Sequence, residues 1–497
     1  MMNLMYSSTR DRGNRVTASQ AVLQGLSPDG GLFVPETIPV LGKSMKELST
    51  LSYQETAYEV MKLFLTDYTE EELKDCIAKA YDSKFDTPEI APLKKVGQAF
   101  YLELFHGATI AFKDMALSIL PHLLTKSAEK NNVKEEIVIL TATSGDTGKA
   151  ALSGFADVKG TSIIVFYPKD GVSSVQEKQM VTQQGANTHV VGIHGNFDDA
   201  QTGVKKMFNN TDLAERLKKA GYLFSSANSI NIGRLVPQIV YYVYSYATLL
   251  KQNQIVDGEK INFVVPTGNF GNILAAYYAK HIGVPIEKLI CASNENKVLF
   301  DFFETGKYDR NREFILTESP SMDILVSSNL ERLIYHIADN DSDKTAELMK
   351  ALSSHGAYEI TDQMRENLQG ILGGWASEQE TKEAIDRTYS DYGYVIDTHT
   401  AVAASVYHNY ITETNDSTKA VIVSTASPYK FGKSVLDALH TSDIPEDDYE
   451  QALILKKLSK TEIPNAVEEI RTAPVLHTKV CKTEKMQSVV EEILKII

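Results

Sequence analysis

The sequence predicts an α/β protein with two lobes, each built on a mainly parallel sheet covered by helices, together with a separate N-terminal unit. Two observations lead to this prediction. Short β-branched runs alternate with amphipathic, helix-like stretches through the middle of the chain, and they fall into two blocks that a helix-rich stretch around 225–255 separates. Strand–helix alternation with short links is typical of parallel sheets covered by helices, so two blocks indicate two lobes with a cleft between them.

The first block begins with the run EIVILTA at 136–142, a pattern typical of a buried parallel strand. The elements expected after it are a helix over 149–158, a strand over 162–167, a helix over 172–184, a strand over 188–192 and a helix over 198–219. Each strand gives way to a helix within a few residues, which indicates a parallel sheet covered by helices.

The second block repeats this order of elements. Its expected elements are a strand over 261–266 (INFVVP), a helix that runs to His281, a strand near 289–292 and a buried strand over 421–424. Residues 310–395 are charged and helix-rich, and the acidic tail from Asp443 is expected to form surface helix with short strands near 475–480.

We therefore expect three units along the chain. The first contains a Pro-Asp-Gly-Gly sequence at 28–31, which apolar helices follow. The predicted boundaries are 1–97 for this N-terminal unit, 98–235 for a lobe with a candidate lysine and a Ser-Gly-Asp-Thr-Gly loop, and 236–497 for a lobe with a Gly-rich loop, a helical insertion and a C-terminal tail. A chain of 497 residues is too long for one simple core, which agrees with this division.

Composition and charge exclude several classes of protein. Fifty basic and 65 acidic side chains give a formal charge of −15, which argues against nucleic-acid and anionic-membrane partners. The three cysteines, Cys76, Cys291 and Cys481, are far apart, so we expect neither a disulfide framework nor a metal site, and a cytoplasmic location. The longest uncharged apolar run, Leu235–Leu250, is shorter than the roughly 18 residues that a membrane-spanning helix needs.

Three loops at the ends of expected strands are candidate sites, because ligands in open α/β sheets bind beyond the carboxyl ends of strands. The first, Thr267-Gly-Asn-Phe-Gly-Asn272, follows a strand and opens a helix. Its two glycines would let an anion approach the backbone N–H groups closely, as in a phosphate cradle. A tight turn with glycines for packing explains the loop equally well.

The second loop, Ser144-Gly-Asp-Thr-Gly148, also lies between an expected strand and helix. Lys149 gives it a superficial similarity to a nucleotide-binding Walker loop. That comparison fails, because Thr143 replaces a glycine and Ala150 stands where a magnesium-binding hydroxyl is required. A nest for a carboxylate or phosphate and a helix N-cap without a ligand both stay open.

The third loop contains Lys113 in a largely apolar stretch between Phe112 and Asp114. Burial of an ammonium group is costly and favours the neutral amine, which is the form that condenses with an aldehyde. On the local pattern alone, a surface lysine whose stem lies on apolar neighbours is the more frequent arrangement.

The segment His106–Leu117 (HGATIAFKDMAL) resembles the cofactor-lysine signature of the threonine synthases, and TSGDTG at 143–148 resembles the loop that follows it. The GNFGN run at 268–272 matches in order and spacing. Similar segments continue along nearly the whole chain, at Tyr6–Arg10, Gly25–Pro35, Asn228–Asn231, Ala292–Asn296, Ser319–Asp323, Asp397–Val402 and Ser424–Phe431. An ordered set of this kind is far more specific than any one motif.

Four positions depart from the family pattern. Ala108 and Thr398 stand where proline is usual, which changes only the stiffness of the backbone. Ser427 and Tyr429 replace a histidine and an alanine, so a role that the family gives to that histidine does not carry over. The neighbouring Thr425 is kept.

The resemblance implies a fold type II pyridoxal-phosphate enzyme, related to the tryptophan synthase β subunit, in which Lys113 is catalytic and carries the cofactor. Thr425 would face the pyridine nitrogen, and Asp146 would lie near the ring hydroxyl, where related folds usually have asparagine. The residues implied to bind the cofactor phosphate through backbone donors are Gly268, Asn269, Phe270, Gly271 and Asn272.

For the substrate, the resemblance implies that the loop with Ser144, Gly145 and Thr147 binds its carboxylate. An acidic chain needs a local cation for an anionic substrate, and Arg234, just beyond Asn231, is the candidate for the substrate phosphate. A helix-terminal salt bridge explains Arg234 equally well.

The implied reaction converts O-phosphohomoserine and water to threonine and phosphate, the last step of threonine biosynthesis, so the enzyme would be a carbon–oxygen lyase acting on a phosphate ester. His106 and His399 are candidate assistants to Lys113, or structural hydrogen-bonding groups. Two rival functions stay open: another β-replacement or dehydratase enzyme on the same fold, and a non-catalytic phosphate-metabolite binder. We expect a monomer or a weak homodimer.

Overall fold

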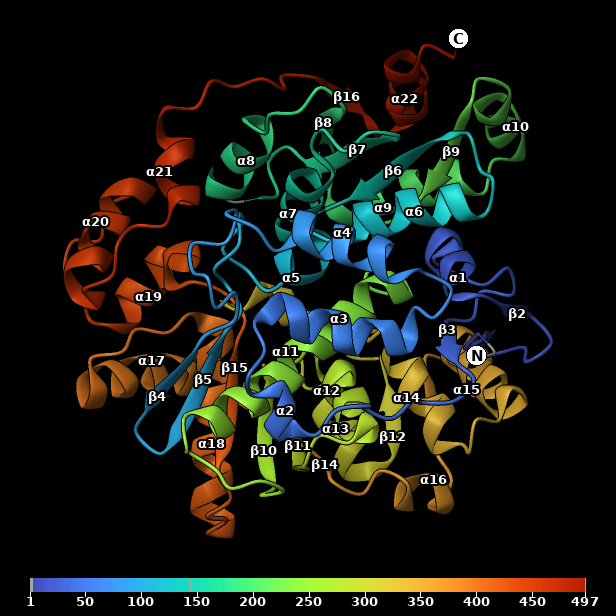
Figure 1. The fold of residues 1–497 in the computed structure, drawn as a ribbon. Helices are drawn as coiled ribbons and strands as arrows, with labels where there is room; N and C mark the ends of the chain where they lie inside the picture. Colours follow the sequence, from blue (N-terminus) through green and yellow to red (C-terminus); the bar gives the residue numbers. More distant parts are fainter. Residues whose placement is uncertain (1–2, 144, 173, 497) are drawn as a thin grey trace.

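The computed structural model describes residues 3–143, 145–172 and 174–496, and two sheets organise them (Figure 1). The sheet in the upper half of Figure 1 has five strands in the order β16-β8-β7-β6-β9, all parallel. Their bounds are β6 Glu136–Ala142, β7 Thr161–Pro168, β8 Thr188–His194, β9 Tyr222–Ser225 and β16 Val480–Lys482. The predicted strand over 136–142 is confirmed without change.

Helices cover both faces of this sheet because its strands are apolar on both sides. Val138 and Leu140 point into one core, whereas Ile137 and Ile139 point into another. The helices of this lobe are α5 Asp114–Leu117, α6 Leu120–Lys130, α7 Asp146–Phe155, α8 Ser174–Val181, α9 Phe197–Phe208, α10 Thr211–Lys219 and α22 Met486–Leu494. The single helix predicted over 198–219 is wrong: the chain forms α9 and α10, because the Asn210 side chain caps a new helix start.

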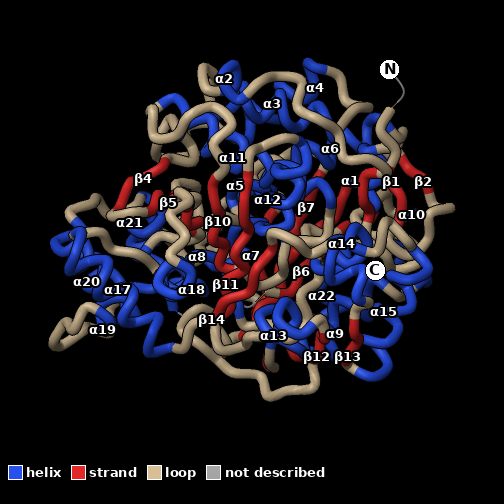
Figure 2. The backbone as a smooth tube through the Cα atoms, turned by 90° about the horizontal axis from the view of Figure 1, so that it is seen from below, coloured by secondary structure: helices blue, strands red, loops and turns tan. Residues whose placement is uncertain are grey.

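The second sheet has six strands in the order β14-β11-β10-β15-β5-β4, and β4 alone runs antiparallel to its neighbour. The bounds are β4 Leu93–Val96, β5 Ala99–Glu103, β10 Ile261–Pro266, β11 Ile286–Ser293, β14 Ile371–Trp375 and β15 Ala420–Ser424. Phe263 and Val265 face the core under α11 (Ile232–Lys251) and α12 (Gly271–Ile282), and Val264 faces α17 (Glu378–Tyr392) and α18 (Thr398–Thr414). Seen from below, the strands occupy the middle of the molecule and the helices surround them (Figure 2). The predicted fold class is confirmed.

The N-terminal unit packs against both lobes, on α6 of the first and on α11. Its antiparallel sheet consists of β1 Tyr6–Ser8, β2 Arg15–Val16 and β3 Phe33–Pro35, and its helices are α1 Ala18–Gln24, α2 Met45–Leu48, α3 Tyr53–Phe64 and α4 Glu70–Ala80. Each helix begins at a serine or threonine whose side chain forms a capping box with the third helical residue. Helix α3 lies against α11, so this unit shares the large apolar core with both sheets.

The remaining elements lie around the second sheet. They are α13 Val298–Thr305, β12 Lys307–Asp309, η1 Pro320–Met322, α14 Leu330–Ile337, α15 Ser342–His355, β13 Ala357–Glu359, α16 Asp362–Glu366, η2 Pro428–Phe431, α19 Gly432–Ala438, α20 Asp448–Ser459 and α21 Asn465–Thr472. The short η3 Thr483–Lys485 lies in the first lobe, against α9 and α22. No helix in the described ranges is long and apolar enough to cross a membrane.

Each of the two large sheets takes strands from separate parts of the chain. Strands β4 and β5 belong to the second sheet although they precede the first sheet in the chain. After α21 the chain returns, in the red arc at the top of Figure 1, and β16 joins the first sheet beside β8. The predicted domain boundaries at 97 and 235 stay a prediction, and the sheets exchange strands across them.

Candidate active site

Lys113 lies in the loop between strand β5 and helix α5, beside the carboxyl end of strand β15. The main-chain N–H of Phe112 donates to the carbonyl of Thr425 (2.8 Å), and Ala111 forms an antiparallel bridge with Ala426. Helix α5 begins at the next residue, Asp114. The lysine that the sequence pattern indicated therefore lies at the edge of the sheet where parallel α/β folds bind their ligands.

The amine of Lys113 contacts a carboxylate and a hydroxyl inside the protein. Its Nζ lies 3.4 Å from Oδ2 of Asp146 and donates to Oγ of Ser321 (3.0 Å). The other carboxylate oxygen, Oδ1, lies 3.1 Å from Nζ of Lys430 and accepts from the amide of Gln176 (3.1 Å). Asp146 is the first residue of α7, where the helix dipole also favours a negative charge.

These contacts shift the protonation of the groups in a direction that suits amine chemistry. Burial lowers the pKa of Lys113 below its ordinary value; the charge of Asp146 opposes this shift, and the nearby Lys430 and Arg234 add to it. Burial alone would raise the pKa of Asp146, but Lys430 and Lys113 outweigh it and hold the pKa far below the ordinary range. The site thus combines a permanent carboxylate with an amine that loses its proton easily.

The Gly-rich loop offers unused donors at the start of α12. Phe270 adopts a left-handed conformation with φ of 63°, and the main-chain carbonyl of Ser321 would lie 2.5 Å from a Cβ added at Gly268. Within the described residues, no acceptor is bonded to the main-chain N–H groups of 268–272. The side-chain amide nitrogen of Asn272 is likewise buried without a partner, while its oxygen accepts from Tyr241 and Tyr242. This set of donors fits a phosphate group.

Arg234 is a buried cation in the first turn of α11. It is 4% exposed, and burial lowers its pKa to about 10. One guanidinium nitrogen donates to the carbonyl of Ala227 (3.0 Å), whereas Nε is buried without a partner and no carboxylate of the described chain pairs with the group. A buried guanidinium without a counter-ion is costly, which indicates that an anion completes the site.

Asn231 has a structural arrangement instead. Its side-chain oxygen accepts from the N–H of Gly233 (2.8 Å) and so caps α11, and its amide nitrogen donates to the carbonyl of Val22 (2.9 Å). Both polar atoms are therefore occupied within the protein. A substrate contact of Asn231 stays a prediction that these bonds do not favour.

The loop before α7 is organised by Thr143, whose hydroxyl accepts from the N–H groups of Gly145 (2.9 Å) and Gly148 (3.0 Å). Gly145 has a φ of 139°, and the Gln176 amide approaches within 2.4 Å of where a Cβ would lie. Thr147 is partly exposed beside them. Ser144, a predicted carboxylate-binding residue, lies outside the described residues.

The sequence interpretation gave no role to Lys430, Ser321 and Gln176, which the fold brings to Asp146. Lys430 and Ser321 belong to segments noted for their family resemblance, and a lysine next to a proline turn carries no local signal of burial. His399 supports the same cluster: its Nε2 accepts from the N–H of Ser321 (3.1 Å), and its Nδ1 lies 2.9 Å from Asp397.

His106 has a different environment. Its ring nitrogens lie 2.5 Å from Asp86 and 2.9 Å from Glu103. Burial alone would lower the pKa of His106, but the two carboxylates outweigh it and raise the pKa to about 9. This arrangement is that of a structural ion-pair network.

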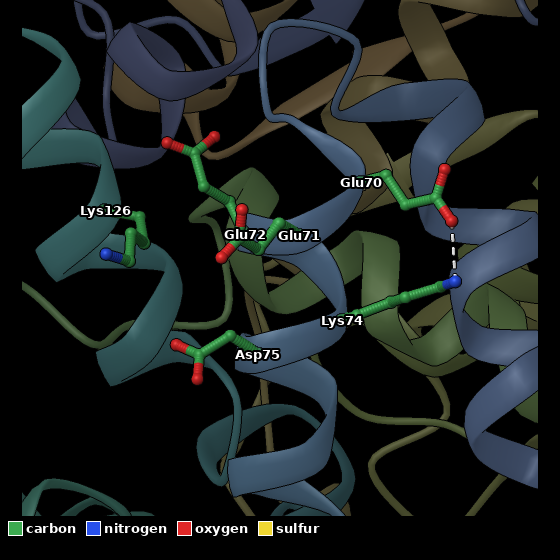
Figure 3. Close-up of a pocket in the computed structure, with 6 residues that line it drawn as sticks. All are labelled: Glu70, Glu71, Glu72, Lys74, Asp75 and Lys126. Carbon is green, nitrogen blue, oxygen red and sulfur yellow. Dashed lines mark hydrogen bonds and ion pairs between the residues drawn. The ribbon is translucent and has the colours of Figure 1, made fainter.

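A hollow on the outer surface lacks these features. It lies between α4 and α6 and is lined by Glu70, Glu71, Glu72, Lys74, Asp75 and Lys126, with an ion pair between Glu70 and Lys74 (Figure 3). None of the predicted site residues lines it, and it is an open, charged surface.

Comparison with known proteins agrees with this geometry. The model of the threonine synthase N terminus matches residues 5–81, that of pyridoxal-phosphate dependent enzymes matches 86–426, and that of the threonine synthase C-terminal region matches 400–490. The chain belongs to the threonine synthase family. The family models cover almost all of the described fold, from β1 into the C-terminal helix α22.

Relatives of two kinds match the chain. Human threonine synthase-like 1 is 40% identical over 483 residues, which are 94% of this chain and 63% of that protein. The chain thus spans less than two thirds of the length of the threonine synthase-like 1 proteins. Threonine synthase of Saccharomyces cerevisiae is 34% identical over 510 residues and is covered over 98% of its length.

Solved structures of threonine synthases share the whole fold. The PLP-bound enzyme of Brucella melitensis superposes with a TM-score of 0.88 at 32% identity and 99% coverage of both chains. The Escherichia coli enzyme gives a TM-score of 0.74 at 26% identity, with 99% of this chain and 100% of that chain covered.

Proposed function

We propose that the chain is a threonine synthase that uses pyridoxal 5'-phosphate to convert O-phosphohomoserine and water to threonine and phosphate. One observation carries the proposal: the buried amine of Lys113 lies against Asp146 at the ligand-binding edge of the sheet, as the family resemblance implies. Membership of the threonine synthase family supports the same activity.

The residues present fit the cofactor. Lys113 would hold it covalently, and the N–H groups of 268–272 with the amide of Asn272 would bind its phosphate, which explains why these donors have no other partner. Thr425 would serve the pyridine nitrogen and Asp146 the region of the ring hydroxyl. When bound, the cofactor supplies an electron sink for the carbanion chemistry of the reaction.

The charges of the site suit a substrate with two anionic ends. Lys113 and Lys430 contact one carboxylate, Asp146, and the buried Arg234 lies close enough to Lys113 to lower its pKa. An acidic protein repels anions at a distance, so this local excess of basic groups would attract the substrate. The substrate carboxylate would bind at the start of α7, near Gly145 and Thr147, and its phosphate would bind Arg234.

Lys113 would then move protons at the substrate. Its lowered pKa makes the neutral amine available as a base, and its contact with Ser321 keeps the amine directed toward Asp146. Ser321 is itself held by His399 through the main chain. The site therefore positions one amine for successive acid and base steps.

Two other functions are weaker candidates. A β-replacement or dehydratase enzyme on the same fold acts on substrates with a single carboxylate, and the unpaired Arg234 favours a substrate with a second anionic group. A non-catalytic phosphate-metabolite binder would not need a buried lysine with a lowered pKa. We also propose a monomer or a weak homodimer located in the cytoplasm.

Release of phosphate from O-phosphohomoserine by the purified protein tests the proposal. We expect phosphate and threonine in equal amounts, with no phosphate without enzyme and no conversion of homoserine. Turnover of serine with no reaction of O-phosphohomoserine would favour the dehydratase alternative. Binding of the substrate without any turnover would favour the metabolite binder.

A further inference from the structure

Lys430 is a buried lysine that contacts the same carboxylate as Lys113. Its side chain is 1% exposed, and its Nζ lies 3.1 Å from Oδ1 of Asp146. The same Nζ donates to the carbonyl of Thr109 (3.0 Å), in the loop that leads to Lys113. The residue belongs to η2, directly after strand β15.

The two lysines approach opposite oxygens of Asp146. Lys430 lies at Oδ1 and Lys113 at Oδ2, so one negative charge serves two amines. When both amines are protonated, one carboxylate cannot compensate them in a buried site, and one of the two protons is weakly held. Lys113 is the amine that gains from losing its proton, because Lys430 and Arg234 both lower its pKa.

We propose that Lys430 is the counter-ion of Asp146, a positioning residue that occupies one carboxylate oxygen so that Lys113 can release its proton beside the other. The inference rests on the proposed role of Lys113 as the cofactor lysine. Lys430 acts through Asp146: it keeps the carboxylate charged and oriented when Lys113 is neutral. Without Lys430, the full charge of Asp146 would bind the Lys113 proton more tightly.

Other charged groups lie near this cluster, and none of them is changed by a substitution at Lys430. Those around Lys113, Asp146 and Lys430 are Arg234 on α11, His399 on α18, Asp114 on α5 and Lys149 on α7. A purely structural role for Lys430 would be the bond to Thr109, which ties η2 to the loop before Lys113. Loss of that bond alone would weaken the fold but would not shift the titration of Lys113 toward higher pH.

The test is the pH dependence with which a small anhydride labels Lys113 in the full-length protein without cofactor, read by peptide mass spectrometry. We expect Lys430→Met to raise the labelling midpoint by about one pH unit, because the competing cation is gone. Lys430→Arg should leave the midpoint near that of the parent protein. Asp146→Asn should lower it, since the attraction for the proton is lost.

Combining Lys430→Met with Asp146→Asn tests whether Lys430 acts on Lys113 through Asp146. In an Asp146→Asn protein, Lys430→Met should shift the midpoint clearly less than in the parent protein. An unchanged midpoint in Lys430→Met, or equal shifts in both backgrounds, would overturn the proposal. If Lys430→Met does not unfold cooperatively, the Asp146→Asn protein tests the proposal by itself. A labelling midpoint of Lys113 that does not fall in Asp146→Asn would then overturn the proposal.

Lys433, on the first turn of α19, is the matched control. It is 63% exposed and pairs with the surface carboxylate of Glu446, so Lys433→Met should leave the midpoint unchanged. Because labelling needs neither cofactor nor substrate, its outcome is separate from that of phosphate release. A protein that makes no threonine could still show the shift of the labelling midpoint. A protein that makes threonine without that shift would contradict the role of Lys430 and leave the proposed function standing.

Discussion

The main-chain carbonyl of Thr425 accepts a hydrogen bond of 2.8 Å from the main-chain N–H of Phe112, the residue before Lys113. The contact uses no side-chain atom, so the threonine hydroxyl can be removed without breaking it. The end of strand β15 and the lysine loop are therefore joined through the backbone, and the Thr425 side chain is left for a role at the cofactor.

Thr425→Val tests that role. A hydroxyl at the pyridine nitrogen stabilises a protonated ring far less than a carboxylate would, and it can also donate to a neutral nitrogen. We expect bound cofactor, a shifted absorption band and turnover reduced at least tenfold, about 1.4 kcal/mol in barrier terms. An unaltered spectrum and rate would show that another group serves the ring nitrogen.

Lys113→Ala should keep the fold and lose both the covalent attachment of the cofactor and turnover. The side chain is only 13% exposed and its charge is costly there, so its removal should not abolish cooperative unfolding. Absorption spectra and phosphate release measure the two losses. Activity close to that of the parent protein would contradict the assignment of Lys113.

Gly271→Asp should lower the affinity for the cofactor by orders of magnitude, because it places a carboxylate where the phosphate approaches the backbone. Gly271→Ala is the matched control: a Cβ at this position would lie 3.5 Å from the Asn329 amide, an ordinary contact. Cofactor titration of the two variants measures the effect. Equal affinities would place the phosphate site elsewhere.

Arg234→Ala should weaken the binding of O-phosphohomoserine and leave the cofactor spectrum intact. The reason is the buried guanidinium, which has no carboxylate partner in the described chain and is free to pair with a phosphate. Steady-state kinetics separate the Michaelis constant from the rate. If both are unchanged, Arg234 does not bind the substrate.

The raised pKa of His106 predicts that the stability of the fold depends on pH. Its pKa is raised to about 9 in the folded protein by Asp86 and Glu103, so the protonated ring stabilises the fold fully below its unfolded pKa, near 6.5, and this contribution is lost as the pH rises through about 9. His106→Gln should lower the melting temperature more at pH 6 than at pH 9.5. Equal losses at the two values would show that the histidine is neutral in the folded protein.

Runs of β-branched residues allowed several strands to be predicted from the sequence. The strands at 136–142 and 261–266 have the predicted bounds, because each run is buried on both faces. Strand β14 was not predicted, since two glycines, which are depleted in strands, interrupt its Ile-Leu-Gly-Gly-Trp sequence. Its Gly374 is needed by packing: a Cβ there would lie 2.4 Å from the side chain of Val406 on α18.

The candidate site was predictable only where local pattern and family resemblance coincide. Lys113 and the loop at 268–272 stand at strand ends and carry recognisable sequences. Lys430 gave no such signal, because its partner Asp146 is far away in the chain and only the parallel sheets bring the two together. The break between α9 and α10 was missed for a local reason, since Asn210 acts as a helix cap within an amphipathic pattern.

Strand β16 has a consequence for biosynthesis. In the folded protein it pairs with Gly192, Ile193 and His194 of β8, yet it is translated long after the other four strands of that sheet. Until residues 480–482 leave the ribosome, β8 presents unpaired backbone groups along an edge that could pair with another nascent chain. The edge of β8 is therefore an aggregation-prone surface during synthesis, for as long as the C-terminal segment is missing.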